Sequence, residues 1–217
     1  MIIYLASFPR SGNTMCRQLV IHYFDRLSTS VYDETIIVSR DKLDEEYPVD
    51  TDKRFRVALD RQQVPYRIVA PDVQNIFDAK FRKELAASPE VFFIKTHELP
   101  YEKYFEGEYV IRIVRHPAVA LWSYYNYLSG YERKTAVLQE VIKGTADVLN
   151  WSYYTNAWFA VENQFKEHFL KIKYESLIDS EELLVAKVQE LTGLSVVNPL
   201  GSFPDFEHWH KSLPQFY

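Results

Sequence analysis

Residues 2–14 read Ile2-Ile3-Tyr4-Leu5-Ala6-Ser7-Phe8-Pro9-Arg10-Ser11-Gly12-Asn13-Thr14. Residues 2–7 form a nearly continuous apolar run, which is typical of a strand covered on both faces. A turn follows at 9–12, and apolar side chains with a period of 3.6 residues predict a helix over residues 14–27. A loop between a strand and a helix start points several backbone N–H groups at one spot, beside the positive end of the helix dipole. This stretch therefore predicts a site for an anion.

The side chains of this loop suit a phosphate-like ligand. Gly12 permits close approach of the backbone, and Arg10 adds a planar cation. Ser11, Asn13 and Thr14 supply short polar groups. The loop is not a Walker A loop, because the G-x-x-x-x-G-K-Ser/Thr spacing is absent. The alternative is an ordinary capped turn, but the coincidence of turn, cation and helix start favours the anion site.

Three further apolar runs predict strands, and they are residues 91–95, 109–114 and 169–174. The first two resemble buried strands, whereas the third alternates polar and apolar side chains like a more exposed strand. Helical stretches accompany them, and they are residues 118–128, 150–165 and 180–193. Strands that alternate with helices indicate a three-layer α/β/α fold with a central parallel sheet. We expect the charged, proline-punctuated segment 28–87 to form helices and loops over one edge of this sheet.

The composition fits one cytoplasmic domain. The chain has 217 residues, with 25 basic and 30 acidic side chains, and this length suits a single domain over residues 1–217. The acidic balance argues against a general nucleic-acid binder. The single cysteine, Cys16, excludes an intrachain disulfide and favours a reducing compartment. No charged leader or apolar run of membrane-spanning length is found, so we expect a soluble protein in the cytoplasm.

A candidate base follows the predicted strand at 91–95. His97 should emerge at the carboxyl end of that strand, at the same edge of the sheet as the anion loop. A neutral imidazole can remove the proton of an attacking hydroxyl, while Lys95 and Arg10 can stabilise charge on a leaving oxygen. The alternative is a capping or surface histidine. The Lys-x-His spacing opposite an anion loop favours the catalytic interpretation.

A second anion site is suggested at the end of the strand at 109–114. Arg115 precedes a helix start at Pro117, and alternation along the strand puts Arg112 on the opposite face. Ser123 lies two turns into that helix. From the residues alone, an ion pair for Arg115 and core packing for Ser123 explain the pattern as well as a second anion site does.

Four further histidines are interpreted as structural, and they are His22, His168, His208 and His210. The pair at 208 and 210 has no cysteine or second cluster of ligands beside it. We therefore predict no metal site.

Four segments in order resemble the sulfotransferases that use 3′-phosphoadenosine 5′-phosphosulfate (PAPS). Residues 7–14 are similar to the family's 5′-phosphosulfate loop, and residues 95–100 to its Lys-Thr-His-Leu-Pro segment. Residues 110–125 are similar to its 3′-phosphate segment, and residues 151–175 to its later helix and strand. The resemblance reaches from residue 2 to about residue 190, with segment 28–87 unmatched. It implies a P-loop NTPase-like fold.

The resemblance also implies a function. The chain would transfer a sulfuryl group from PAPS to a hydroxyl or amine of a small-molecule, lipid or sugar acceptor, with adenosine 3′,5′-bisphosphate as the product. His97 would be the general base, with Lys95 and Arg10 beside the transferring group. The implied cofactor-binding residues are Arg10, Ser11, Gly12, Asn13 and Thr14 for the 5′-phosphosulfate, Arg115 and Ser123 for the 3′-phosphate, and Met15 and Tyr174 near the adenine.

The sequence departs from this family at two places. Met15 stands where the family usually has a tryptophan that stacks on the adenine. The family continues with an Arg-Lys-Gly-x-x-Gly segment that closes over the 3′-phosphate, whereas this chain ends at Tyr217, about where that segment should begin. We therefore expect either a truncated form or an incomplete 3′-phosphate clamp.

Two other functions remain open. A nucleotide-dependent kinase on a P-loop-like fold is disfavoured, because Gly-Lys-Ser/Thr and a clear magnesium-binding aspartate after a strand are both missing. A non-catalytic nucleotide-binding protein is the other alternative.

Candidate borders of an acceptor pocket are the acidic stretch 41–46 and Tyr124, Tyr125 and Tyr127, although a solvated face and core packing explain these patterns as well. We expect neither nucleic acid nor an integral membrane segment.

Overall fold

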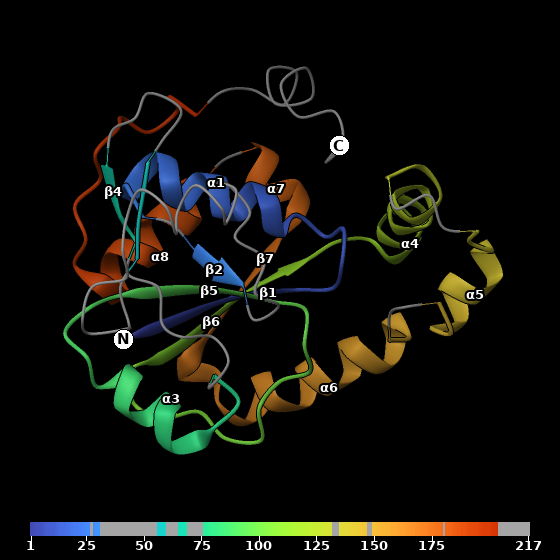
Figure 1. Ribbon diagram of the computed structural model, residues 1–217, viewed down its shortest axis with the longest axis horizontal. Helices are drawn as coiled ribbons and strands as arrows, with labels where there is room; N and C mark the ends of the chain where they lie inside the picture. Colours follow the sequence, from blue (N-terminus) through green and yellow to red (C-terminus); the bar gives the residue numbers. More distant parts are fainter. Residues whose placement is uncertain are drawn as a thin grey trace.

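The computed structural model describes residues 1–26, 28–30, 56–59, 65–68, 76–131, 135–146, 149–179 and 181–203. In this part of the chain, five strands form one sheet in the order β2-β5-β1-β6-β7, and all neighbours are parallel (Figure 1). The strands are β1 (Ile2–Ser7), β2 (Ser28–Ser30), β5 (Phe92–Thr96), β6 (Glu108–Val114) and β7 (Phe169–Lys173). The sheet confirms the predicted α/β class, and the alternating run forms edge strand β7 as its pattern indicated.

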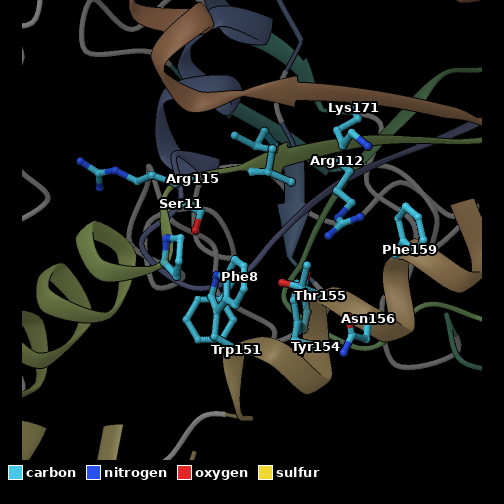
Figure 2. Close-up of a pocket in the computed structure, with 13 residues that line it drawn as sticks. Phe8, Ser11, Arg112, Arg115, Trp151, Tyr154, Thr155, Asn156, Phe159 and Lys171 are labelled. Atoms are coloured by element: carbon cyan, nitrogen blue, oxygen red, sulfur yellow. The ribbon is translucent and has the colours of Figure 1, made fainter. Parts of the chain in front are cut away.

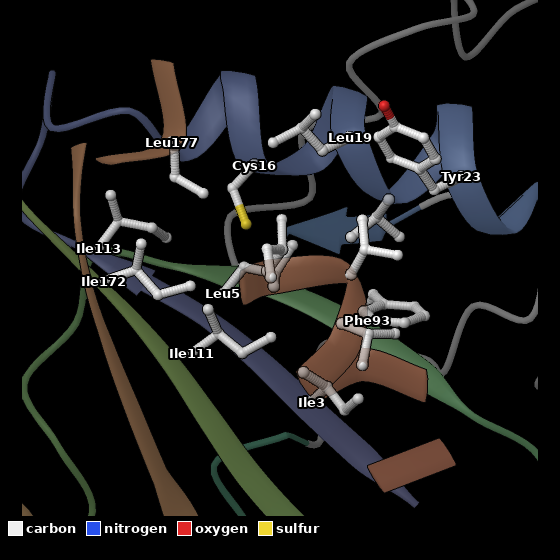
Figure 3. Close-up of a cluster of buried hydrophobic side chains, with 14 of the residues drawn as sticks. Ile3, Leu5, Cys16, Leu19, Tyr23, Phe93, Ile111, Ile113, Ile172 and Leu177 are labelled. Atoms are coloured by element: carbon white, nitrogen blue, oxygen red, sulfur yellow. The ribbon is translucent and has the colours of Figure 1, made fainter. Parts of the chain in front are cut away.

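The central strand β1 is buried along its whole length because both faces of the sheet are covered. Ile3 and Leu5 pack on one face, and Ile2 and Tyr4 pack on the other, as the two-residue period of a strand requires. Figure 3 shows the first of these clusters, in which the side chain of Cys16 points from the covering helix toward the sheet. Cys16 is free and fully buried.

Helices cover both faces of the sheet (Figure 1). One face carries α1 (Asn13–Phe24), α7 (Tyr174–Asp179) and α8 (Glu182–Thr192). The other face carries α3 (Ala79–Ala86) and α6 (Trp151–Gln164). The other helical elements are α4 (Pro117–Asn126), the π-helix η2 (Tyr127–Tyr131), α5 (Leu138–Lys143) and the 3-10 helix η3 (Lys166–His168). Across the described ranges, no helix is both long and apolar enough to cross a membrane.

The prediction for segment 28–87 was wrong in part. It contains the short edge strand β2, and β3 (Arg56–Leu59) pairs with β4 (Pro65–Ile68) in a separate antiparallel sheet. Strands of three or four residues are too short to show a periodic pattern, which is why the sequence did not reveal them. Helix α7 was also missed, because it begins directly where β7 ends and the expected strand ran one residue into it.

A buried ion pair anchors the connection between β5 and β6. Glu108, the first residue of β6, accepts hydrogen bonds from Arg82 Nε at 2.8 Å and from Tyr4 Oη at 2.7 Å. Arg82 Nη2 also donates to Glu108 Oε2 at 2.6 Å and to the carbonyl oxygen of Lys103 at 2.8 Å. Both charges are buried and paired, so they hold the connection between β5 and β6 against the sheet. This connection begins at His97.

Candidate active site

Three strand ends meet where the sequence predicted a site. In the parallel sheet, Ala6 of β1 pairs with Thr96 of β5, and Ser7 of β1 pairs with Ile113 of β6. The carboxyl ends of β5 and β6 therefore flank the end of β1, from which the anion loop leaves. As expected, His97 follows directly after one of these ends.

The start of α1 has no side-chain cap among the described residues. Its N-cap is Gly12, whose φ of 100° favours glycine, and Arg10 before it also has a positive φ of 63°. Asn13 does not cap the helix, because its amide donates to the carbonyl oxygen of Leu5 at 2.7 Å and ties the loop to β1. The N–H groups of the first turn, which no carbonyl within the helix accepts, are therefore directed at the loop.

His97 is held by the carbonyl group at the end of β1. Its Nδ1 lies 2.7 Å from the carbonyl oxygen of Ser7. A carbonyl oxygen only accepts, so Nδ1 donates and carries the ring proton. In the neutral ring the lone pair is then on Nε2, the atom that can accept a proton from a bound hydroxyl. This contact fixes both the orientation and the tautomer of the ring.

The surroundings of His97 favour its neutral form. Burial, followed by the positive charge of Lys95, lowers the pKa of His97 to about 3, against an opposing effect of the hydrogen bond to Ser7. Lys95 is the next-to-last residue of β5 and is half-buried. The Lys-x-His spacing thus places a cation and a neutral imidazole at the same strand end.

This pKa has a consequence for stability in acid. Between pH 6.5 and pH 3 the unfolded chain binds a proton at His97 that the folded chain does not bind, so the free energy of unfolding decreases as the pH falls. From pH 7 to pH 5 we expect the wild-type chain to lose about 1–2 kcal/mol more than the His97→Asn variant. Denaturant unfolding at several pH values measures this difference, and parallel pH curves for the two proteins would contradict the low pKa.

The structure brings Arg10 together with the second predicted anion site. Arg10 Nε donates to Ser123 Oγ at 3.2 Å, and its guanidinium lies 5.2 Å from the centre of the Tyr127 ring. Arg115 Nη1 donates to the carbonyl oxygen of Arg10 at 3.0 Å. Arg10 therefore lies between the two groups of residues that the sequence analysis treated separately. The contact with Tyr127 on η2 was missed, because it joins residues far apart in the sequence.

Tyr174 packs against both the loop and Arg115. The Arg115 guanidinium lies 4.3 Å from the centre of the Tyr174 ring. A Cβ atom at Gly12 would lie 2.2 Å from Cδ2 of the same ring. Burial raises the pKa of Tyr174, so its phenol stays protonated. Arg112 pairs instead with Glu162 of α6, on the face of the sheet opposite to α7, which carries Tyr174.

The other predicted residues lie around this centre. Ser11 is buried and Thr14 is half-buried in the loop and first turn, and Met15 packs against the cluster beneath α1. Tyr124 is buried beside Leu128 and Val141 in the core between α4 and α5. The acidic stretch 41–46 and the residues after 203 lie outside the described part of the chain.

Two histidines have structural contacts, as interpreted from the sequence. His168 Nδ1 donates to the carbonyl oxygen of Glu108 at 2.7 Å, and His22 Nε2 lies 2.9 Å from Ser202 Oγ. His208 and His210 fall outside the residues that can be described. In the remainder, no group of three or more His, Cys, Asp or Glu side chains is arranged to hold a metal ion.

Fold and site together define an α/β protein in which an uncapped helix start lies at the carboxyl edge of a parallel sheet. The chain belongs to the sulfotransferase domain family, whose sequence model matches residues 2–203. Its fold is accordingly of the P-loop NTPase-like type. The family resemblance seen in the sequence is thereby confirmed.

A solved structure shares this fold. It is that of mouse sulfotransferase SULT7A1 complexed with PAP, with a TM-score of 0.54 and 19% sequence identity. The alignment covers 100% of this chain and 64% of that chain, so this chain spans less than two thirds of its length. No protein with curated annotation matches the sequence significantly.

Proposed function

We propose that this chain is a PAPS-dependent sulfotransferase that acts on a hydroxyl or amine of a small-molecule, lipid or sugar acceptor. The observation that carries the proposal is the uncapped start of α1 with Arg10, Arg115 and Ser123 grouped around it, close to the strand end that bears His97. Membership of the sulfotransferase domain family and the fold shared with a PAP-bound sulfotransferase support it. A cytoplasmic location stays a prediction.

The residues present fit an anionic nucleotide. The first-turn N–H groups after Gly12 have no side-chain cap in the described structure, and the buried Nε of Arg115 has no hydrogen-bond partner there. In this proposal residues 10–14 hold the 5′-phosphosulfate. Arg115 and Ser123 hold the 3′-phosphate, and the adenine lies near Met15 and Tyr174.

PAPS, when bound, supplies the activated sulfuryl group. His97 takes the proton of the acceptor hydroxyl on Nε2, while the Ser7 carbonyl keeps the Nδ1 proton in place. Lys95 stabilises negative charge at the strand end where transfer takes place. An anion beside Lys95 opposes the effect of that ammonium on His97, so it raises the pKa of His97 and makes the ring a better base.

Arg10 gives a direct test of the nucleotide site. The variant Arg10→Ala should bind adenosine 3′,5′-bisphosphate about tenfold more weakly. It loses the guanidinium that lies between the two proposed phosphate sites and would make a charge-assisted contact with the ligand. Calorimetry measures the affinity. Arg26→Ala is the matched control, since the contact of Arg26 is with the Asp25 carbonyl at the far end of α1. Equal affinities for the two variants would remove Arg10 from the site.

The experiment that tests the proposed function compares ligands. Calorimetry with adenosine 3′,5′-bisphosphate, 5′-AMP and ATP, each with and without Mg²⁺, should show a metal-independent preference for the bisphosphate. Preference for ATP with Mg²⁺ would indicate a kinase instead. Bisphosphate binding without turnover on a panel of phenols, alcohols and amines would indicate a non-catalytic nucleotide-binding protein.

A further inference from the structure

A pocket lies on the α6 side of the sheet, behind the anion loop (Figure 2). It has a volume of about 400 Å³, within the range of small-molecule sites. Its walls come from the loop, the end of β6, and α6, with Lys171 of β7 at one side. Neither His97 nor Lys95 is among its described lining residues. The pocket therefore excludes the proposed base, although two of its lining residues, Ser11 and Arg115, are also assigned to the proposed nucleotide site.

One end of the pocket is cationic. Arg112 is only 3% exposed, and its Nη1 pairs with Glu162 Oε2 at 2.8 Å. Lys171 Nζ lies 3.1 Å from Oε1 of the same carboxylate. Two cations thus share one anion, which leaves a net charge of about +1 at this end. The Nε of Arg112 is buried without a hydrogen-bond partner in the described structure, although a buried guanidinium normally has its donors satisfied.

The other walls are aromatic. Phe8, Trp151 and Phe159 line the pocket, and Figure 2 shows them around the space into which Arg112 points. Ser11, 1% exposed, also lines it, and its Oγ has no hydrogen-bond partner among the described residues. Flat apolar walls, with one uncompensated positive charge and the unsatisfied Arg112 Nε at one end, complement a flat ring that carries a single negative charge.

We propose that this pocket binds a small aromatic monoanion, namely an aryl carboxylate. Its ring lies between Phe8, Trp151 and Phe159, and its carboxylate accepts from Arg112 Nε. This site goes beyond the proposed sulfotransferase function, because the proposed ligand contacts are Arg112 and the aromatic walls rather than His97 or the residues assigned to the nucleotide.

The test uses 2-naphthoate and its uncharged analogue 2-naphthamide, which have the same ring and differ in charge. Calorimetry on the full chain should show one 2-naphthoate site, at least tenfold tighter than for 2-naphthamide, and unchanged by saturating adenosine 3′,5′-bisphosphate. The proposal would be overturned by absent 2-naphthoate binding, by equal affinities for both compounds, or by competition with the bisphosphate. Because bisphosphate binding is measured separately, failure here is distinguishable from failure of the proposed function.

Variants on α6 locate the ligand. Phe159 lines the pocket and is 56% exposed, so Phe159→Ala should leave folding intact and weaken 2-naphthoate binding about fivefold. Tyr153→Ala is the matched control, since Tyr153 is 58% exposed on the same helix and does not line the pocket. Arg112→Gln should bring the affinities for 2-naphthoate and 2-naphthamide within about twofold of each other. Equal affinities of the Phe159→Ala and Tyr153→Ala variants would place the ligand elsewhere.

Discussion

Replacement of His97 by asparagine is expected to lower the turnover number by about 10²–10⁴-fold, the usual contribution of a general base. The asparagine amide can still donate to the Ser7 carbonyl, so the contact that anchors this residue to β1 is kept. What is lost is the basic Nε2. The affinity for adenosine 3′,5′-bisphosphate should change less than threefold, because the proposed phosphate contacts lie in the loop, at Arg115 and on α4. Turnover with PAPS and a panel of phenols, alcohols and amines measures the first quantity, and calorimetry measures the second.

His168→Asn provides the matched control for this experiment. His168 also donates from Nδ1 to a backbone carbonyl at 2.7 Å, but that carbonyl belongs to Glu108, at the opposite end of β6 from the site. The control should keep wild-type turnover. If His97→Asn kept full turnover as well, the assignment of His97 as the base would be wrong. If it lost bisphosphate binding to the same extent as turnover, His97 would have a structural role in the cofactor site.

The fold was largely predictable because its buried strands carry a strong local signal. Strands β1, β5 and β6 have near-continuous apolar sequences, and their order along the chain, with helices between, implies a parallel sheet. β2 has the sequence Ser-Thr-Ser, which shows no periodicity, and pairs with β5 at the sheet edge. Such an element depends on the strand beside it and cannot be read from its own residues.

The candidate site divides in the same way. The place of His97 was predictable, because the carboxyl ends of adjacent parallel strands share one edge. The hydrogen bond of Arg10 to Ser123 was not, since it joins side chains 113 positions apart in the sequence. The pocket around Arg112 was missed for a similar reason. Its lining comes from the loop, β6, α6 and β7, and no single segment of the sequence carries its pattern.

Gly12→Ala is expected to give the second large effect, on both stability and nucleotide binding. An alanine at this position would have to adopt a φ of 100°, which costs about 1–3 kcal/mol for a residue with a side chain. Its Cβ would also lie 2.2 Å from the ring of Tyr174, so the ring or the loop must shift. We expect the free energy of unfolding to fall by about 3 kcal/mol and bisphosphate affinity to fall at least tenfold. Denaturant unfolding and calorimetry measure the two effects.

The control Gly193→Ala separates backbone strain from the steric effect. Gly193, at the end of α8, has a φ of 67°, but a Cβ atom there would meet nothing within 4 Å. Its alanine variant should lose about 1 kcal/mol and bind the bisphosphate like wild type. The additional loss in Gly12→Ala then reports the packing of Tyr174 against the loop. Both variants could instead lose the same free energy of unfolding and keep full affinity for the bisphosphate. The close contact between Gly12 and Tyr174 would then have no part in holding the nucleotide.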